Sequence, residues 1–309
     1  MIKRICLILF LFLIFLNKSF SSINVYILAT VDNEIITNYD IKKEIDYLKI
    51  LNPNLEQLSE NEIEIIAKNS LIKEIIKKNE VVKVIDVNKK NPFVEDYLKN
   101  FYSKLNINNK DEFEKNLKEK NNYTLEEIKE KIKIELLWNE LIFLKYGNQV
   151  KINKEKLSKK IENLNSETQK EYMLSEIVFE KQKDKSLKNF FNEINLSIKE
   201  IGFNNSANIY SISESSKIGG KIGWVNENSL SELLIDNLKS LKVGEHTGLI
   251  KLGNNYLILK IDEIKYNAVR IDKKKELEKM VKFETNKQLN QFSRIFFNRS
   301  KMNYAINEN

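Results

Sequence analysis

The sequence predicts an α+β protein: a mostly helical N-terminal domain is completed by a C-terminal helix, and a smaller α+β domain is inserted between them. Two observations predict this. Seven of the eight glycines fall between Gly202 and Gly253, which is typical of a compact, turn-rich module. On both sides of that module, apolar residues recur at helical spacing. A chain of 309 residues, 42% hydrophobic and 31% charged, is long enough for two modest domains.

The first 22 residues have the pattern of a secretory signal peptide. Two basic residues precede an apolar run at 5–16, and polar or small residues follow it through Ser22. The run is shorter than the ~20 residues of a membrane span. We therefore expect cleavage near Ser22, loss of Cys6, and a mature protein in the periplasm that is not an integral membrane protein. An anchor that stays uncleaved is the alternative.

Charge and motif content restrict the function. The net charge is +7, and without residues 1–22 it is +4, from 48 basic and 44 acidic residues. Basic residues alternate with acidic ones and form no stripe, so we expect no nucleic-acid partner. The sequence shows no set of metal ligands and no phosphate loop, so we expect no metal and no cofactor.

In the first domain, predicted over 23–168, a small β-hairpin at 25–37 precedes several helices. Capping boxes beginning at Thr37, Ser59 and Thr124 indicate helix starts. A further helix begins near Pro92 and carries Phe93, Tyr97 and Phe101 on one face. These aromatic residues could line a peptide groove, but the spacing favours plain helix–helix packing.

The second domain is predicted over 169–266. Its expected elements are a strand at 172–179, a helix at 186–201, an extended segment at 207–211, a helix at 229–240, and strands at 247–250 and 256–264. The glycine stretch at 219–224 ends in Trp224, whose ring we expect to be buried. The last segment, 267–309, contains a long helix at 271–298 that must pack on the N-terminal helices, because its apolar stripe would not be stable alone. A short final strand is expected at 303–306.

Three stretches of the inserted domain resemble the parvulin (PpiC, or rotamase) family of prolyl isomerases. They are Gly-Gly-Lys-Ile-Gly-Trp at 219–224, Leu-Lys-Val-Gly-Glu at 241–245 and Tyr-Leu-Ile-Leu-Lys-Ile at 256–261. The segments from 31 onward, 111–141 and 298–305 are similar to SurA-type proteins. The resemblance implies a periplasmic chaperone with a single parvulin domain that escorts unfolded outer-membrane β-barrel precursors.

The resemblance also assigns site positions. The two histidines of an active parvulin correspond to Glu176 and Leu257, and the cysteine or aspartate corresponds to Ser213. The peptide-binding groove corresponds to Leu230, Leu234 and Tyr210. His246, the only histidine, lies in a connection away from these positions, where we expect it to be exposed.

With every polar position of the site exchanged, we assign no catalytic residue. We expect a chaperone that binds unfolded or extended polypeptides, with weak or absent isomerase activity. The alternative function is an active peptidyl-prolyl cis-trans isomerase that uses a non-standard site. A membrane-anchored foldase that retains its N-terminal segment is a third hypothesis.

Overall fold

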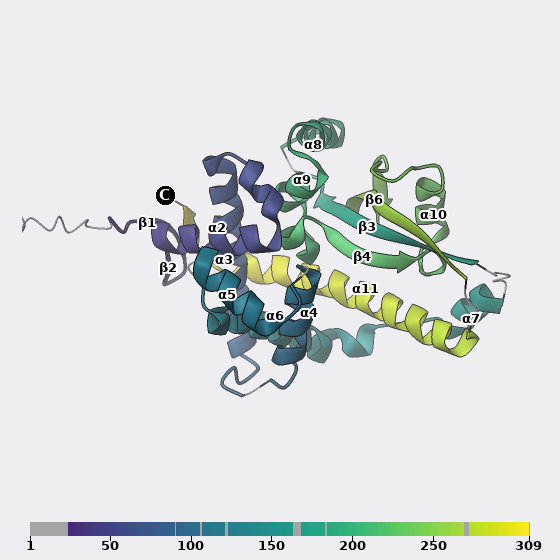
Figure 1. The fold of residues 1–309 in the computed structure, drawn as a ribbon, viewed down its shortest axis with the longest axis horizontal. Helices are drawn as coiled ribbons and strands as arrows, with labels where there is room; N and C mark the ends of the chain where they lie inside the picture. Colours follow the sequence, from purple (N-terminus) through teal and green to yellow (C-terminus); the bar gives the residue numbers. More distant parts are fainter. Residues whose placement is uncertain are drawn as a thin grey trace, which may run out of the picture.

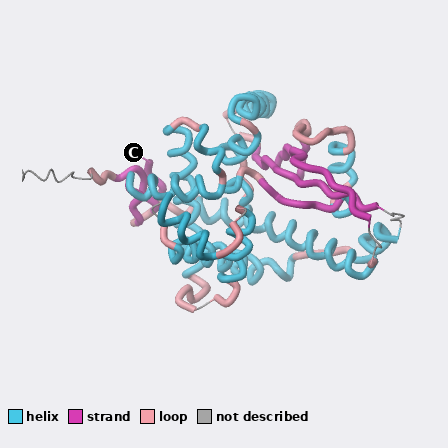
Figure 2. The backbone as a smooth tube through the Cα atoms, viewed as in Figure 1, coloured by secondary structure: helices cyan, strands magenta, loops and turns pink. Residues whose placement is uncertain are grey.

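The computed structural model describes residues 24–89, 91–105, 107–120, 123–162, 168–182, 184–268 and 272–308. The predicted signal peptide lies outside these ranges. Within them, no helix has a stretch long and apolar enough to cross a membrane. Figure 1 shows a cluster of helices around the two chain ends, beside a small sheet with its own helices. Figure 2 shows how most of the strands gather in that second region.

The two ends of the described chain meet in one three-stranded sheet of order β2-β1-β7. Strands β1 (Ile27–Val31) and β2 (Glu34–Thr37) form the predicted hairpin, and β7 (Ile306–Glu308) pairs antiparallel with β1. The Asp32 amide donates to the Ala305 carbonyl at 2.8 Å beside this pairing. Head and tail of the chain therefore belong to one folding unit.

The helices of this unit begin where the local signals predict. Thr37, Ser59 and Thr124 each form a complete capping box, with reciprocal bonds between the capping residue and the acidic residue three positions on. The helices are α2 (Asn38–Leu51), α3 (Glu60–Val82), α4 (Val94–Lys104), α5 (Lys110–Lys120), α6 (Leu125–Tyr146) and α7 (Lys154–Glu162). Short 3-10 turns η1 (Pro53–Gln57) and η2 (Gly147–Gln149) join them.

The long C-terminal helix α11 (Lys273–Lys301) packs against α6, α3 and α7. Its central contact is with Trp138 of α6, which is fully buried and donates its indole N–H to Ser293 Oγ at 2.8 Å. Phe296 and Phe297 add rings at 5.5 and 6.3 Å from Trp138. The apolar stripe of α11 thus has the helical partner that it needs.

The inserted domain is a four-stranded antiparallel sheet of order β4-β3-β6-β5. Its strands are β3 (Thr168–Glu180), β4 (Lys221–Asn226), β5 (Ile250–Leu252) and β6 (Asn255–Ala268). Its helices are α8 (Leu187–Ile201), α9 (Phe203–Tyr210) and α10 (Glu232–Leu238), with the 3-10 turns η3 (Glu214–Ile218) and η4 (Glu227–Ser229). In Figure 1, α8 and α9 lie on one side of the sheet and α11 passes on the other.

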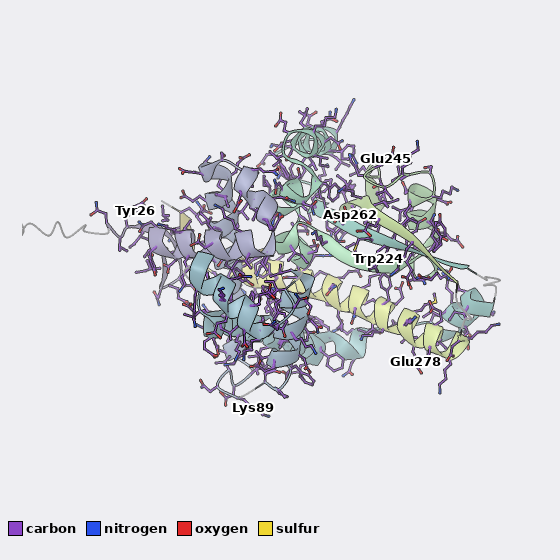
Figure 3. All side chains as sticks on the ribbon, in the orientation of Figure 1. Tyr26, Lys89, Trp224, Glu245, Asp262 and Glu278 are labelled. Carbon is purple, nitrogen blue, oxygen red and sulfur yellow. The ribbon has the colours of Figure 1, made fainter. Side chains whose placement is uncertain are left out.

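Two expectations about this domain are wrong. The segment at 207–211, expected to be extended, lies mostly in α9, which begins at Phe203, directly after Gly202 with φ of 84°, and ends at Tyr210. Trp224, expected to be buried, is 38% exposed on the edge strand β4 (Figure 3). Lys265 Nζ lies 4.0 Å from the centroid of its ring, so the indole makes a cation–π contact at the surface instead of filling the core.

Candidate functional site

Glu176 enters the site from β3, on the sheet face that it shares with Leu174 and Val178. Because side chains alternate along a strand, these three point the same way. Glu176 is partly buried, and its Oε1 accepts a hydrogen bond from Ser215 Oγ at 2.9 Å. The neighbouring backbone is held close, since the Glu176 amide donates to the Gly220 carbonyl at 2.8 Å.

Gly220 explains one glycine of the 219–224 stretch. Its φ is 79°, and a Cβ built on it would lie 2.3 Å from the Glu176 carbonyl oxygen. Any side chain here would push η3 away from β3. The glycine therefore allows the segment that carries Ser213 and Ser215 to lie against Glu176.

A chain of hydroxyl groups leads away from Glu176. Ser215 Oγ is hydrogen-bonded to Ser213 Oγ at 2.7 Å, and Ser213 Oγ to Ser211 Oγ at 2.9 Å. Ser211 Oγ accepts from the Val178 amide at 3.0 Å. Glu176 and Ser213, two positions predicted from sequence, are thus joined through Ser215, which was not predicted. The alternation Ser-Ile-Ser-Glu-Ser at 211–215 is the sequence signal that could have revealed it.

The environment raises the pKa of Glu176 above its ordinary value. Burial raises the pKa of its carboxyl group, while the Ser215 hydroxyl and the positive charge of Arg294 act in the opposite direction. Arg294 comes from α11, so a residue of the helical domain contributes to the field at this site. Its Nε atom is buried without a hydrogen-bond partner among the described residues.

Leu257, at the predicted position of the second histidine, is 3% exposed and pairs across the sheet with Val178. It belongs to an apolar cluster that also contains Leu230, and Leu234 packs against that cluster. The structure therefore brings Leu257, Leu230 and Leu234 together on the face that bears Glu176. Leu230 is itself buried. The two predicted groove leucines therefore belong mainly to the hydrophobic core.

Tyr210 lies elsewhere. It packs with the cluster on the opposite face of the sheet, where its ring is 5.9 Å from that of Phe190 in α8. The structure does not place Tyr210 beside Leu230 and Leu234, because α9 and not a strand carries it. Residue spacing alone cannot tell these two faces apart.

His246 also lies away from Glu176. It is half-buried, its Nδ1 is 2.9 Å from the Thr247 carbonyl, and its ring is 6.1 Å from that of Phe203. Phe203 belongs to the α8–α9 face of the sheet. No imidazole among the described residues joins the Glu176–serine chain, and no group of three metal-ligand side chains in these ranges could hold a metal ion.

A hollow of about 530 Å³ lies between α7, α11 and the loop before α10. Leu230 lines it, and Lys160 Nζ bridges to the Leu230 carbonyl at 2.5 Å. Five lysines and two glutamates are among its lining residues: Lys151, Lys156, Lys159, Lys160, Lys287, Glu232 and Glu284. We call it the lysine-lined hollow; its excess of positive charge favours acidic segments of a bound chain.

A second surface lies on α4. Phe93 and Tyr97 are 60% and 51% exposed, so the expectation of plain helix packing is wrong for these two residues. Phe101 contacts Phe113, with ring centroids 5.7 Å apart. Tyr97 and Phe101 line a cavity of about 230 Å³ that reaches Ile218 of η3. This α4 cavity therefore opens between the helical domain and the inserted domain.

Comparison with known proteins identifies the inserted domain. Residues 173–263 match the family of PpiC-type PPIase (rotamase) domains. The chain contains a PpiC-type domain. The match includes Glu176, Ser213, Leu230, Leu234 and Leu257. A comparison with curated proteins finds no match.

Solved structures give likenesses of fold. One of two SurA-like chaperones of Campylobacter jejuni is 18% identical, with a TM-score of 0.33, and the match covers 92% of this chain and 98% of that one. PrsA of Bacillus subtilis is 18% identical, with a TM-score of 0.30 and coverage of 88% and 91%. An isolated PpiC-type domain is 23% identical, with a TM-score of 0.30 and coverage of 34% and 100%. The family match, and not these likenesses, identifies the domain.

Proposed function

We propose that the protein is a periplasmic chaperone that binds unfolded or extended polypeptides, and that its PpiC-type domain is a weak or inactive isomerase. The observation that carries the proposal is the composition of the Glu176 site. The carboxyl group bonds to hydroxyl groups, the second histidine position is a buried leucine, and the site holds no imidazole within the described residues.

The chemistry explains why this composition matters. Rotation about a prolyl bond must overcome the amide resonance barrier of ~18–20 kcal/mol that applies to peptide bonds. Side chains that donate and accept protons near neutral pH can stabilise the twisted amide, and histidine suits that role best. Serine hydroxyls supply hydrogen bonds but do not change charge near neutral pH.

Two features support polypeptide binding. The exposed rings of Phe93 and Tyr97 offer apolar contacts to an extended chain. The lysine-lined hollow lies beside the groove residue Leu230. We propose that clients contact both surfaces, that outer-membrane β-barrel precursors are among the clients, and that the domain boundaries are 23–168, 169–266 and 267–309.

A second candidate function is favoured by the Glu176 carboxyl itself. A protonated carboxyl group that is hydrogen-bonded to Ser215 could donate to a prolyl amide in an apolar setting. The protein would then be an active isomerase with a carboxyl–hydroxyl site in place of the histidines.

One pair of assays separates the two functions. The protein is tested for acceleration of prolyl isomerisation in a short peptide, and for suppression of aggregation of an unfolded β-barrel protein. We expect suppression without acceleration, and no change in suppression for Glu176→Ala with Ser213→Ala. Acceleration that disappears in the double variant would establish the isomerase instead.

A further inference from the structure

The junction between the two domains holds a cavity that the proposed function does not use. It measures about 230 Å³ and is bounded by α3, α9, η3 and α11. Lys73, Lys217 and Lys301 line it, and no aspartate or glutamate of the described chain does. Its positive charge thus comes from both domains at once, because Lys217 belongs to η3 and the other two to the helical domain.

Lys73 has no counter-ion in the part of the chain that the structure describes. Among the described residues no carboxylate lies within ion-pair distance of Lys73 or Lys301, whereas Lys217 is paired with Glu135 at 2.9 Å, outside the cavity lining. Burial lowers the pKa of Lys73 to about 8; Lys217 and Lys77 add to the lowering, and Glu214 and Glu135 oppose it. Lys73 is half-buried in the cavity wall, and a bound anion would supply the charged partner that its ammonium group lacks.

Polar donors and apolar walls share the cavity. Asn69 lies one helical turn before Lys73 on α3, and Asn298 lies one turn before Lys301 on α11. The remaining walls include Leu48, Ile66, Ile72, Ile212 and Phe297. An inorganic anion would leave these apolar walls without contacts. The volume is below the roughly 300–1,000 Å³ of pockets for drug-sized ligands, so it suits a short ligand.

We propose that this interdomain cavity binds a carboxylate joined to an apolar group, with the carboxylate at Lys73 and the apolar group against Ile66 and Phe297. The same chemistry occurs in the C-terminal residue of a polypeptide and in a short organic acid. The proposal is independent of the proposed function, because neither the lysine-lined hollow nor Glu176 takes part in it.

The test measures binding to the full-length mature protein by calorimetry. The probes are N-acetyl-phenylalanine, its amide, and inorganic phosphate. We expect the acid to bind and the amide and phosphate to bind more weakly by roughly ten- to a hundredfold, since a charged hydrogen bond is lost or the apolar contact is absent. Equal affinity for acid and amide, or tighter binding of phosphate, would overturn the proposal.

Variants locate the site. Lys73→Met should lose binding to a similar extent, and Lys78→Met, an exposed lysine on the same helix, should leave it unchanged. Lys301→Ala, at an exposed position, should also weaken binding of the acid. It keeps the test valid if Lys73→Met alters the fold. Unchanged binding in both Lys73→Met and Lys301→Ala would refute the assignment.

A last comparison distinguishes the two sources of the carboxylate. A hexapeptide that ends in phenylalanine with a free carboxylate is compared with its amidated form and with 3-phenylpropionate. Tighter binding of the free-acid peptide than of 3-phenylpropionate identifies a polypeptide C-terminus as the ligand, and the reverse order identifies a short acid. Binding of the peptide acid and amide alike would contradict both sources.

Discussion

Glu214 Oε2 lies 2.7 Å from Lys77 Nζ, and this contact joins the PpiC-type domain to the helical domain. Lys77 is fully buried and also contacts Glu135 Oε2 at 2.7 Å, while Glu135 Oε1 contacts Lys217 at 2.9 Å. Glu214 immediately precedes Ser215, the residue that bonds to Glu176. The segment beside the candidate site is therefore the segment that docks on the helices.

Replacing Glu135 with glutamine should destabilise the protein. Burial raises the pKa of Glu135, but Lys217 and Lys77 outweigh it and hold the pKa well below its ordinary value. Glutamine keeps the shape and leaves two lysines around an uncharged group. We expect a loss of roughly 1–3 kcal/mol in the free energy of unfolding, measured by urea denaturation, because Glu135 is itself 35% exposed and Lys77 keeps Glu214 as its second partner.

Glu130→Gln is the matched control on the same helix. Glu130 is 66% exposed, and within the described ranges it pairs with Lys133 alone, three positions along α6. Exposed pairs contribute about 0–1 kcal/mol, so little change is expected. If both substitutions change the free energy of unfolding equally, the ion pairs between the domains stabilise the protein no more than an exposed pair does.

Glu176→Gln should change how stability depends on pH. Because burial raises the folded-state pKa of Glu176 above the ordinary 4.5, the folded protein keeps a proton that the unfolded chain has lost. Stability from this group therefore falls as pH rises from about 4.5 through the folded pKa. Glutamine removes that loss, so the variant should gain stability relative to the wild type between pH 4 and pH 7.

Urea unfolding at pH 4, 5.5 and 7 measures this difference. Glu263→Gln, an exposed carboxylate on β6 of the same sheet, is the control and should show no such trend. A difference between Glu176→Gln and wild type that is constant across the three pH values would contradict a buried carboxyl group.

Local signals predicted the helix starts, because a capping box is complete within four residues. Thr37, Ser59 and Thr124 show this. The exposure of Trp224 could not be predicted in the same way, because it depends on β4 being an edge strand, which follows from the order of distant strands.

The site could be predicted only in part, because some of its residues are far apart in the sequence. Glu176 and Ser213 were predicted from matched motifs, while Ser215 was not predicted, although its spacing from Ser211 and Ser213 is a local signal. Lys77 is 137 residues from Glu214 in sequence, and no local pattern links them. Arg294 is likewise brought near Glu176 only by the path of α11.

Replacing Phe93 and Tyr97 together with serine should weaken client protection. Both rings are exposed on the α4 surface, so the change removes apolar contact area without opening a core cavity. We expect aggregation of an unfolded β-barrel client to be suppressed severalfold less, while the urea midpoint of the chaperone stays nearly constant. Tyr266→Ser is the control, since Tyr266 is 68% exposed on β6. If the double variant protects as well as Tyr266→Ser, the clients bind elsewhere.

The bond between Trp138 and Ser293 should be measurable as a coupling between α6 and α11. Ser293→Ala leaves the indole N–H buried without a partner, which we expect to cost about 1–3 kcal/mol of unfolding free energy. Trp138→Phe removes that N–H together with part of the ring packing against Phe296. Adding Ser293→Ala to Trp138→Phe should therefore cost much less than Ser293→Ala alone. Urea unfolding of the four proteins gives the coupling energy, and strict additivity would mean that this hydrogen bond does not help to hold α11 on the helical domain.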